Sequence, residues 1–279
     1  MNTIAYLHNC NAGDLICALP AIRSAHRKCG KKAVIYQQLN VPGHYYEGAI
    51  HSVRDESGVQ VTMNLHIYNM LRPLLLAQDY IADFLVFEEG MINKNDIVDL
   101  TKIRDKVNVN IPYGSLLSWI PLLAAPLACD ISEPWIDFVG LNDIAKNRIL
   151  INRTQRYTNP AIKYDFLKKF QSELLFVGTE LEHALFCKEN DLNFPRLEID
   201  NFLDLAEIMK MCRFFIGNQS FPWNLANGLG ISRILEQCYY APNCQAFIGP
   251  ENYGFLSQPN LEYFFEELYN KKGHLDKVA

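Results

Sequence analysis

One turn near the N-terminus holds a residue that could move a proton. An apolar strand is expected over residues 3–8 and a helix over residues 15–29, and Asp14 lies in the polar turn between them. A carboxylate there would lie at the carboxyl edge of a parallel sheet, where it could accept a proton from an incoming hydroxyl. The alternative is that Asp14 caps the helix and complements its dipole. The turn by itself favours the cap.

A second turn has the composition of an anion-binding site. Residues 213–216 predict an apolar strand, and residues 223–229 predict a helix. The turn and the first helical turn contain Gly217, Asn218, Gln219, Ser220 and Asn224. The N–H groups of such a helix start, and its dipole, favour a bound anion or nucleotide. An ordinary strand–helix corner capped by Asn218 or Ser220 fits the same stretch equally well.

Charged side chains follow other expected strand ends. Arg153 and Arg156 come after the strand expected over residues 148–152, so either guanidinium could bind a phosphate or lie in solvent. Arg153 is nearer the strand and is the first choice, and Lys163 on the next helix is a weaker candidate. Glu236 ends a later strand, where its carboxylate could bind ribose hydroxyls or be an ordinary strand-end charge.

Residues near the candidate base could bind an acceptor. Asn11 and Gly13 share its turn, and His8 ends the first strand. His44 and Tyr45 follow the second strand, where their rings could stack on a sugar. His8 could equally be a core histidine, and the aromatic residues could pack on a neighbouring domain.

The order of elements predicts an α/β fold. Strands are expected over residues 3–8, 33–37, 148–152, 173–177, 213–216 and 233–236, and helices over 15–29, 164–170, 180–190, 203–211, 223–229 and 263–270. Pro20 is expected to kink its helix or delay its start. The pattern predicts two Rossmann-like domains facing a cleft, residues 1–145 and 146–279.

The middle of the chain is less regular. It predicts a strand over residues 60–67, a loop and helix over 70–82, and a strand over 84–87. Residues 100–104 and 116–129 are expected to be helical or loop segments. Variable segments that follow strands are typical of substrate recognition.

Composition limits the function classes. The net charge of -5 argues against a protein that coats nucleic acid. The longest apolar run, residues 116–129, is interrupted by prolines and shorter than the roughly 20 residues of a membrane span. The eight cysteines include no C-x-x-C pair, which favours reduced thiols over a metal site. No secretory signal is visible, so we expect a cytoplasmic protein, with peripheral contact to the inner face of the membrane as an option.

The first turn carries a family resemblance. The segment Gly13-Asp14-Leu15, followed by Leu19-Pro20-Ala21-Ile22, resembles the opening motif of the family 9 glycosyltransferases, the ADP-heptose:lipopolysaccharide heptosyltransferase superfamily. The aspartate of that motif is taken to be the general base, which the resemblance places on Asp14.

The second turn is similar to the family's turn beside the donor diphosphate. Gly217, Ser220 and Ala226 match its layout. The pair Asn218-Gln219 stands where the family has aspartate, and Asn224 stands where it has histidine. The resemblance covers both ends of the chain, about half of its length, and leaves residues 39–137 unmatched.

The resemblance implies a GT-B glycosyltransferase. Its C-terminal domain would bind a nucleotide-diphosphate sugar as co-substrate, and its N-terminal domain a glycan or lipopolysaccharide-type acceptor. Arg153, Ser220 and the helix that follows would stabilise the departing diphosphate. Inverting transfer needs no paired nucleophile, and the chain has no D-x-D motif, so no metal and no other cofactor are expected.

Three alternatives remain from the sequence. A non-catalytic nucleotide- or glycan-binding protein on the same scaffold would explain Asn218. A glycosyltransferase acting on modified bases of phage DNA is less favoured, because the net charge is -5. A nucleotide-sugar epimerase would need a carboxylate or histidine pair across the cleft, which the sequence does not supply.

Overall fold

The computed structural model describes residues 2–43, 50–93, 96–101, 133–137, 140–238 and 251–275. The chain forms two compact units. The first comprises Met1–Val139 with Asp200–Leu203, and the second comprises Gly140–Ile199 with Asp204–Ala279. In the described part of the chain, no helix has the length and apolar character needed to cross a membrane.

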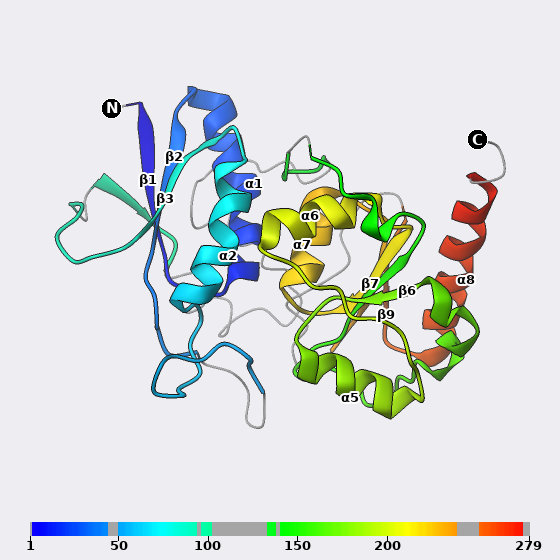
Figure 1. Ribbon diagram of the computed structural model, residues 1–279. Coiled ribbons are helices and arrows are strands. Elements are labelled where there is room, and N and C mark those ends of the chain that lie inside the picture. Colours follow the sequence, from blue (N-terminus) through cyan, green and yellow to red (C-terminus); the bar gives the residue numbers. More distant parts are fainter. Residues whose placement is uncertain are drawn as a thin grey trace. The chain divides into compact units, whose positions relative to one another are not determined.

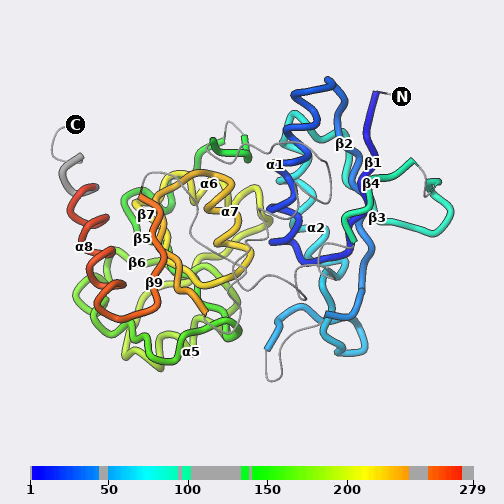
Figure 2. Tube along the Cα trace, turned by 180° about the vertical axis from the view of Figure 1, so that it is seen from behind, coloured from blue at the N-terminus to red at the C-terminus, as the bar shows by residue number. Residues whose placement is uncertain are grey.

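The first unit contains a parallel sheet of four strands. These are β1 (Thr3–His8), β2 (Lys32–Gln37), β3 (Ile81–Val86) and β4 (Ile97–Asp99), in the order β3-β2-β1-β4. The helices α1 (Ala12–Cys29) and α2 (Leu65–Leu76) lie against the same face of this sheet (Figures 1 and 2). Helix α1 connects β1 to β2, and α2 connects β2 to β3, so both connections advance along the sheet in the same direction. Connections of the usual right-handed kind then place both helices on one face.

Helix α1 accommodates a proline with the help of a distant tryptophan. It begins at Ala12, earlier than expected, and continues through Pro20. Pro20 has no N–H, so it cannot donate to the carbonyl of Ile16 four residues earlier. The indole N–H of Trp135 donates to this carbonyl at 3.1 Å, and both residues are buried. Trp135 thus replaces the hydrogen bond that the proline removes.

This replacement predicts a measurable coupling. Replacing Trp135 with phenylalanine should lower the free energy of unfolding by about 1–3 kcal/mol, because the buried Ile16 carbonyl loses its donor. In a Pro20→Ala background the new N–H of residue 20 can donate to Ile16, so the same change should cost less. Urea denaturation of the four proteins measures both costs. Equal costs in the two backgrounds would contradict this account of the hydrogen bond.

The strand expected over residues 60–67 is wrong. The segment enters α2 at Leu65, after the Asn64 side chain accepts a hydrogen bond from the Ile67 N–H at 3.0 Å. Residues buried at helical spacing, Tyr68, Leu71, Leu74 and Leu75, fix the inner face of α2.

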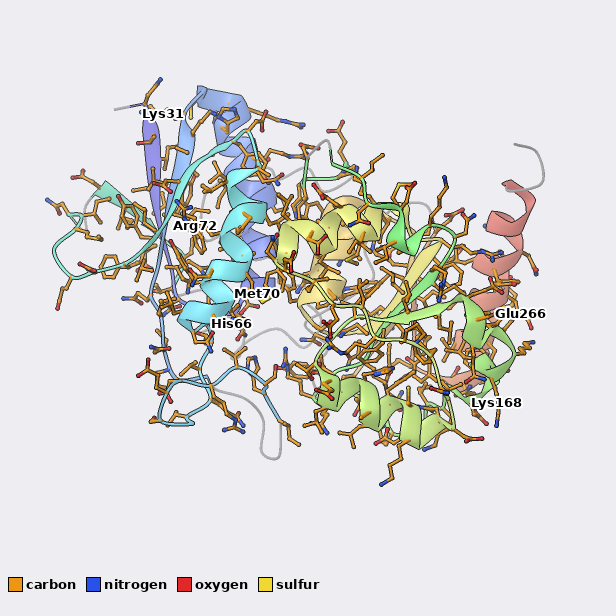
Figure 3. The ribbon with its side chains drawn as sticks, viewed as in Figure 1. Lys31, His66, Met70, Arg72, Lys168 and Glu266 are labelled. Atoms are coloured by element: carbon orange, nitrogen blue, oxygen red, sulfur yellow. The ribbon has the colours of Figure 1, made fainter. Side chains whose placement is uncertain are left out.

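Arg72 of α2, labelled in Figure 3, extends toward β3, where its guanidinium pairs with the Asp83 carboxylate at 3.2 Å. The next strand begins at Ile81 rather than at residue 84, and the short strand β4 was not predicted. Most of residues 100–104, and all of residues 116–129, lie outside the described residues.

The second unit contains a parallel sheet of five strands. These are β5 (Ile149–Asn152), β6 (Leu174–Phe176), β7 (Phe214–Asn218), β8 (Arg233–Glu236) and β9 (Asn252–Phe255), in the order β6-β5-β7-β8-β9. Its helices are η2 (Asp143–Ala145), η3 (Asp165–Glu173), α5 (Glu180–Asn190), α6 (Phe202–Met211), α7 (Phe221–Leu229) and α8 (Gln258–Leu275). Strand β9 was not predicted, and residues 165–173 form a 3-10 helix.

Both faces of this second sheet are covered. Ile149, Phe214 and Ile216 face a core shared with η3, α5 and α8, where Phe265 packs edge-on against Phe214 at 5.5 Å between ring centroids. On the opposite face, the ring of Phe215 lies 6.5 Å from that of Trp223 in α7. Strands β5, β7 and β8 are buried along their whole length, as expected for a parallel sheet with helices on both sides. The α/β fold with two parallel sheets is confirmed.

Candidate functional site

Each sheet has a point where its strand order reverses. In the first unit this point lies between β1 and β4, and in the second between β5 and β7. Open parallel sheets bind ligands beyond the carboxyl ends of the strands at such points. Asp14 follows β1, Arg153 and Arg156 follow β5, and Ser220 follows β7. The fold therefore brings the main predicted residues to these two edges.

Asp14 is the third residue of α1 and caps the start of its own helix. It is 6% exposed, and its Oδ2 accepts hydrogen bonds from the Asn11 N–H at 3.1 Å and from Asn11 Nδ2 at 3.2 Å. Asn11 is the residue before the helix, and Gly13, between Asn11 and Asp14 in the sequence, is buried. The capping role of Asp14 is confirmed, and its role as a base stays a prediction.

His8 is a fully buried residue at the end of β1. Its Nδ1 lies 2.7 Å from the side-chain Oε1 of Gln37, the residue beside it on β2. Gln37 Nε2 donates to the Gln38 carbonyl at 2.8 Å, so its Oε1 is the acceptor and His8 Nδ1 carries the proton. This pair positions the ring at the same sheet edge as Asp14. His44 and Tyr45 lie outside the described residues.

The corner between β7 and α7 is built by close backbone packing. A Cβ atom at Gly217 would lie 2.7 Å from the Phe215 ring and 3.2 Å from the Asn152 carbonyl oxygen. Ser220 caps α7, and its Oγ lies 2.7 Å from Asn152 Oδ1. Asn152 Nδ2 donates to the Val177 carbonyl at 2.7 Å, so this one amide connects the ends of β5, β6 and β7.

Gln219 and Asn224 complete this corner. Gln219 is 9% exposed and precedes the cap, and Asn224 is 7% exposed in the first part of α7. The Asn224 N–H donates to the Ser220 carbonyl at 3.2 Å, as the helix begins. Both side chains therefore lie at the start of α7, as the sequence predicts.

Asn218 binds the loop that follows β5. Its Oδ1 accepts from the Thr154 N–H at 2.9 Å, and its Nδ2 donates to the carbonyls of Thr154 at 2.9 Å and Arg156 at 2.8 Å. Asn218 is fully buried. Its amide is therefore a structural link across the point where the strand order reverses.

Glu236 and Arg153, predicted separately as donor ligands, pair with each other. Arg153 Nε and Nη2 lie 2.8 Å and 3.0 Å from the two carboxylate oxygens of Glu236. The Asn159 N–H and the Tyr164 hydroxyl donate to the same carboxylate at 2.6 Å and 2.7 Å. Glu236 is fully buried, and these four hydrogen bonds use its acceptor positions.

The pair sets the charge states in this cluster. Burial opposes the charge of Arg153, but the hydrogen bonds and negative charge of Glu236 outweigh it and raise the pKa of the guanidinium. Burial, with the charge of Glu236, raises the pKa of Tyr164 well above its usual value, so its hydroxyl keeps its proton. In this arrangement the Glu236 carboxylate has no acceptor position left for a ribose.

Arg156 differs from Arg153. It is half-buried, its guanidinium lies 5.6 Å from the centroid of the Tyr157 ring, and among the described residues it has no carboxylate partner. Lys163 is exposed, and its backbone N–H donates to the Gln258 side chain at 2.9 Å. Arg153, the first choice from the sequence, is therefore paired with carboxylates, whereas Arg156, the second choice, has no such pair among the described residues.

Sequence reasoning missed the residues that support this edge, namely Asn152, Thr154, Asn159 and Tyr164. Asn152 and Thr154 directly flank Arg153, so their position after β5 was a usable signal. Asn159 and Tyr164 carry no such signal, because they reach Glu236 from 77 and 72 residues away along the chain. The described residues contain no group of three side chains that could hold a metal ion.

Solved structures of glycosyltransferases share this fold. E. coli heptosyltransferase WaaC with ADP has a TM-score of 0.63 and 8% identity, covering 95% of this chain and 99% of that one. A glycosyl transferase family 9 protein from Veillonella parvula has a TM-score of 0.57 and 10% identity, covering 96% and 89%. E. coli ADP-heptose lps heptosyltransferase II has a TM-score of 0.51 and 13% identity, covering 99% and 100%.

Sequence comparison alone does not reach these proteins. No protein-family model matches the chain, and no curated protein matches it. The resemblance in the two turns and the structural similarity over nearly the whole chain agree on one architecture. The chain therefore has the heptosyltransferase-like fold of the family 9 glycosyltransferases.

Proposed function

We propose that this protein is an inverting, metal-independent glycosyltransferase that uses a nucleotide-diphosphate sugar. The observation that carries the proposal is the position of Asp14, at the carboxyl edge of β1 where the first sheet's order reverses, in a chain with this fold. A similar WaaC structure contains ADP, which supports a nucleotide-sugar donor.

The reaction assigns one role to each unit. The acceptor hydroxyl oxygen attacks the anomeric carbon of the donor and loses its proton to Asp14. The bond between that carbon and the diphosphate breaks, and its electron pair leaves with the nucleotide diphosphate. A single displacement inverts the anomeric configuration. His8, Asn11, Gly13, His44 and Tyr45 are the proposed acceptor residues.

The departing diphosphate needs positive charge in the second unit. The start of α7 supplies its dipole, and Arg156 supplies a cation without a carboxylate partner among the described residues. Gly217, Gln219, Ser220 and Asn224 shape the corner beside it. Arg153, Asn218 and Glu236 support this surface through the contacts they make with the protein.

The proposed acceptor is a glycan, with lipopolysaccharide-type acceptors first and modified phage DNA second. The proposed location is the cytoplasm, with contact at the inner face of the membrane as an option. A non-catalytic nucleotide- or glycan-binding protein is the second candidate. It is favoured by one observation: the polar groups of Arg153, Asn218 and Glu236 are bound by other protein groups. Arg153 pairs with Glu236, Glu236 also accepts from the Asn159 N–H, and Asn218 accepts from the Thr154 N–H.

A thermal-shift panel of nucleotide sugars, beginning with ADP-heptose and its UDP and GDP counterparts, tests the proposal. A donor at 100 times its Kd should stabilise the protein by about 2.7 kcal/mol. The best donor is then assayed for release of nucleotide diphosphate with glycan acceptors. Stabilisation with release supports the transferase, and stabilisation without release supports the binding protein. No stabilisation by any nucleotide sugar would contradict both.

A further inference from the structure

The loop between Arg153 and Tyr157 has a shape that its own residues do not favour. Tyr157 has a φ of 57°, in the left-handed region that an aromatic residue seldom adopts. Such a conformation is strained and persists only where neighbouring groups hold it. The Thr154 hydroxyl lies 3.0 Å from the Arg156 carbonyl and supplies one such contact inside the loop.

The amide of Asn218 supplies the others. Its Nδ2 donates to the carbonyls of Thr154 and Arg156 at 2.9 Å and 2.8 Å, and the Tyr157 carbonyl lies 3.4 Å away. Its Oδ1 accepts from the Thr154 N–H at 2.9 Å. A backbone N–H can only donate and a carbonyl can only accept, so the orientation of this amide is determined. The loop is thus gathered around one fully buried side chain.

An aspartate could still accept from the Thr154 N–H, but it could not donate to the two carbonyls. An ionised carboxylate has no N–H to donate, and it would place negative charge against the carbonyl oxygens of Thr154 and Arg156. The Arg156 carbonyl is one of the held groups, so Asn218 fixes the backbone from which the Arg156 side chain extends, and its guanidinium lies 5.6 Å from the centroid of the Tyr157 ring. The backbone position of Arg156 therefore depends on Asn218.

We propose that Asn218 is a positioning residue: its amide fixes the loop so that Arg156 binds the diphosphate of the donor. The proposal rests on the proposed function, because it takes the donor to be a nucleotide diphosphate. It assigns Asn218 an indirect role, since its amide is occupied by protein groups and acts through Arg156. It also predicts that aspartate cannot replace asparagine at this position.

The test combines Asn218→Asp with Arg156→Gln and uses ADP as the probe in isothermal titration calorimetry. Each single change should weaken ADP binding by about 10- to 100-fold, the loss of one hydrogen bond to a charged group. The double variant should bind ADP no more weakly than Arg156→Gln alone, because both changes remove the same contact. Additive losses, or an unchanged affinity in Asn218→Asp, would overturn the positioning role.

Asn190→Asp is the matched structural control. Asn190 is also buried in this unit, and its amide also connects a backbone N–H, that of Tyr164 at 2.8 Å, with a carbonyl, that of Phe186 at 2.8 Å. This variant should lose stability but keep the ADP affinity of the parent protein. A matching loss of ADP affinity in Asn190→Asp would show that general destabilisation explains the Asn218 result.

Limited proteolysis provides a readout without ligand. Trypsin should cut after Arg156 faster in Asn218→Asp than in the parent protein or in Asn190→Asp, and unchanged cleavage would overturn the proposal.

If Asn218→Asp does not fold, Thr154→Val provides a second variant. It removes the second contact to the Arg156 carbonyl, so it should weaken ADP binding, and its effect should not add to that of Arg156→Gln. If the parent protein does not bind ADP but cleavage in Asn218→Asp is faster, the donor assignment fails while the loop contact stands.

Discussion

Replacing Glu236 with glutamine is expected to lower the free energy of unfolding of the second unit by about 3–5 kcal/mol. Glu236 is fully buried and neutralises Arg153, whose side chain is 11% exposed. Glutamine has nearly the same shape, but it leaves the guanidinium charge buried and unpaired, and it turns an N–H group toward a donor. Removing one partner of such a pair costs far more than the pair contributes.

Glu189 provides the control for this prediction. Its carboxylate lies 3.6 Å from Arg153 Nη1, but the Glu189 side chain is 57% exposed, so Glu189→Gln should change stability by about 0–1 kcal/mol. Replacing both members of the buried pair, with Arg153→Met and Glu236→Leu, should recover part of the loss because no charge remains buried. Urea denaturation of the variants measures these differences. Equal costs for Glu236→Gln and Glu189→Gln would show that burial does not determine the cost of removing a carboxylate partner of Arg153.

Replacing Asp14 with asparagine is expected to reduce turnover by about 10²- to 10⁴-fold, the range of a lost general base. The asparagine oxygen can still accept from the Asn11 N–H, so the cap on α1 and the fold should be retained. Donor binding is assigned to the second unit, so ADP affinity should stay the same. Nucleotide release under saturating donor and acceptor, with ADP titration alongside, measures both properties.

The control for Asp14 is a second helix cap in the same unit. Asn64→Ala removes the side chain that caps α2 and should cost about 1 kcal/mol of stability without lowering turnover. If Asp14→Asn and Asn64→Ala reduce turnover equally, Asp14 contributes only through the helix cap. Full turnover in Asp14→Asn would remove the base from the proposed mechanism.

Local sequence patterns identified the elements whose determinants lie within a few residues. Strand β8 and helix α5 were predicted with the bounds that the structure has, because buried apolar residues mark the strand and Thr179 and Glu182 cap the helix start. The cap formed by Asp14 is also local, since its partner Asn11 is three residues away. Strands β4 and β9 have weaker apolar patterns and were missed, because pairing with a neighbouring strand stabilises them.

The sequence by itself determined an α/β chain with Asp14 after the first strand and a polar corner before α7. Only the tertiary structure decided what the polar groups at the second corner contact. Glu236 meets Arg153 across 83 residues, Asn218 meets Thr154 across 64, and Trp135 meets Ile16 across 119. Such partners are chosen by the order and register of strands, because burial requires each polar group to find a partner nearby in space. That requirement pairs Arg153 with Glu236, which is why we propose Arg156 as the cation for a donor.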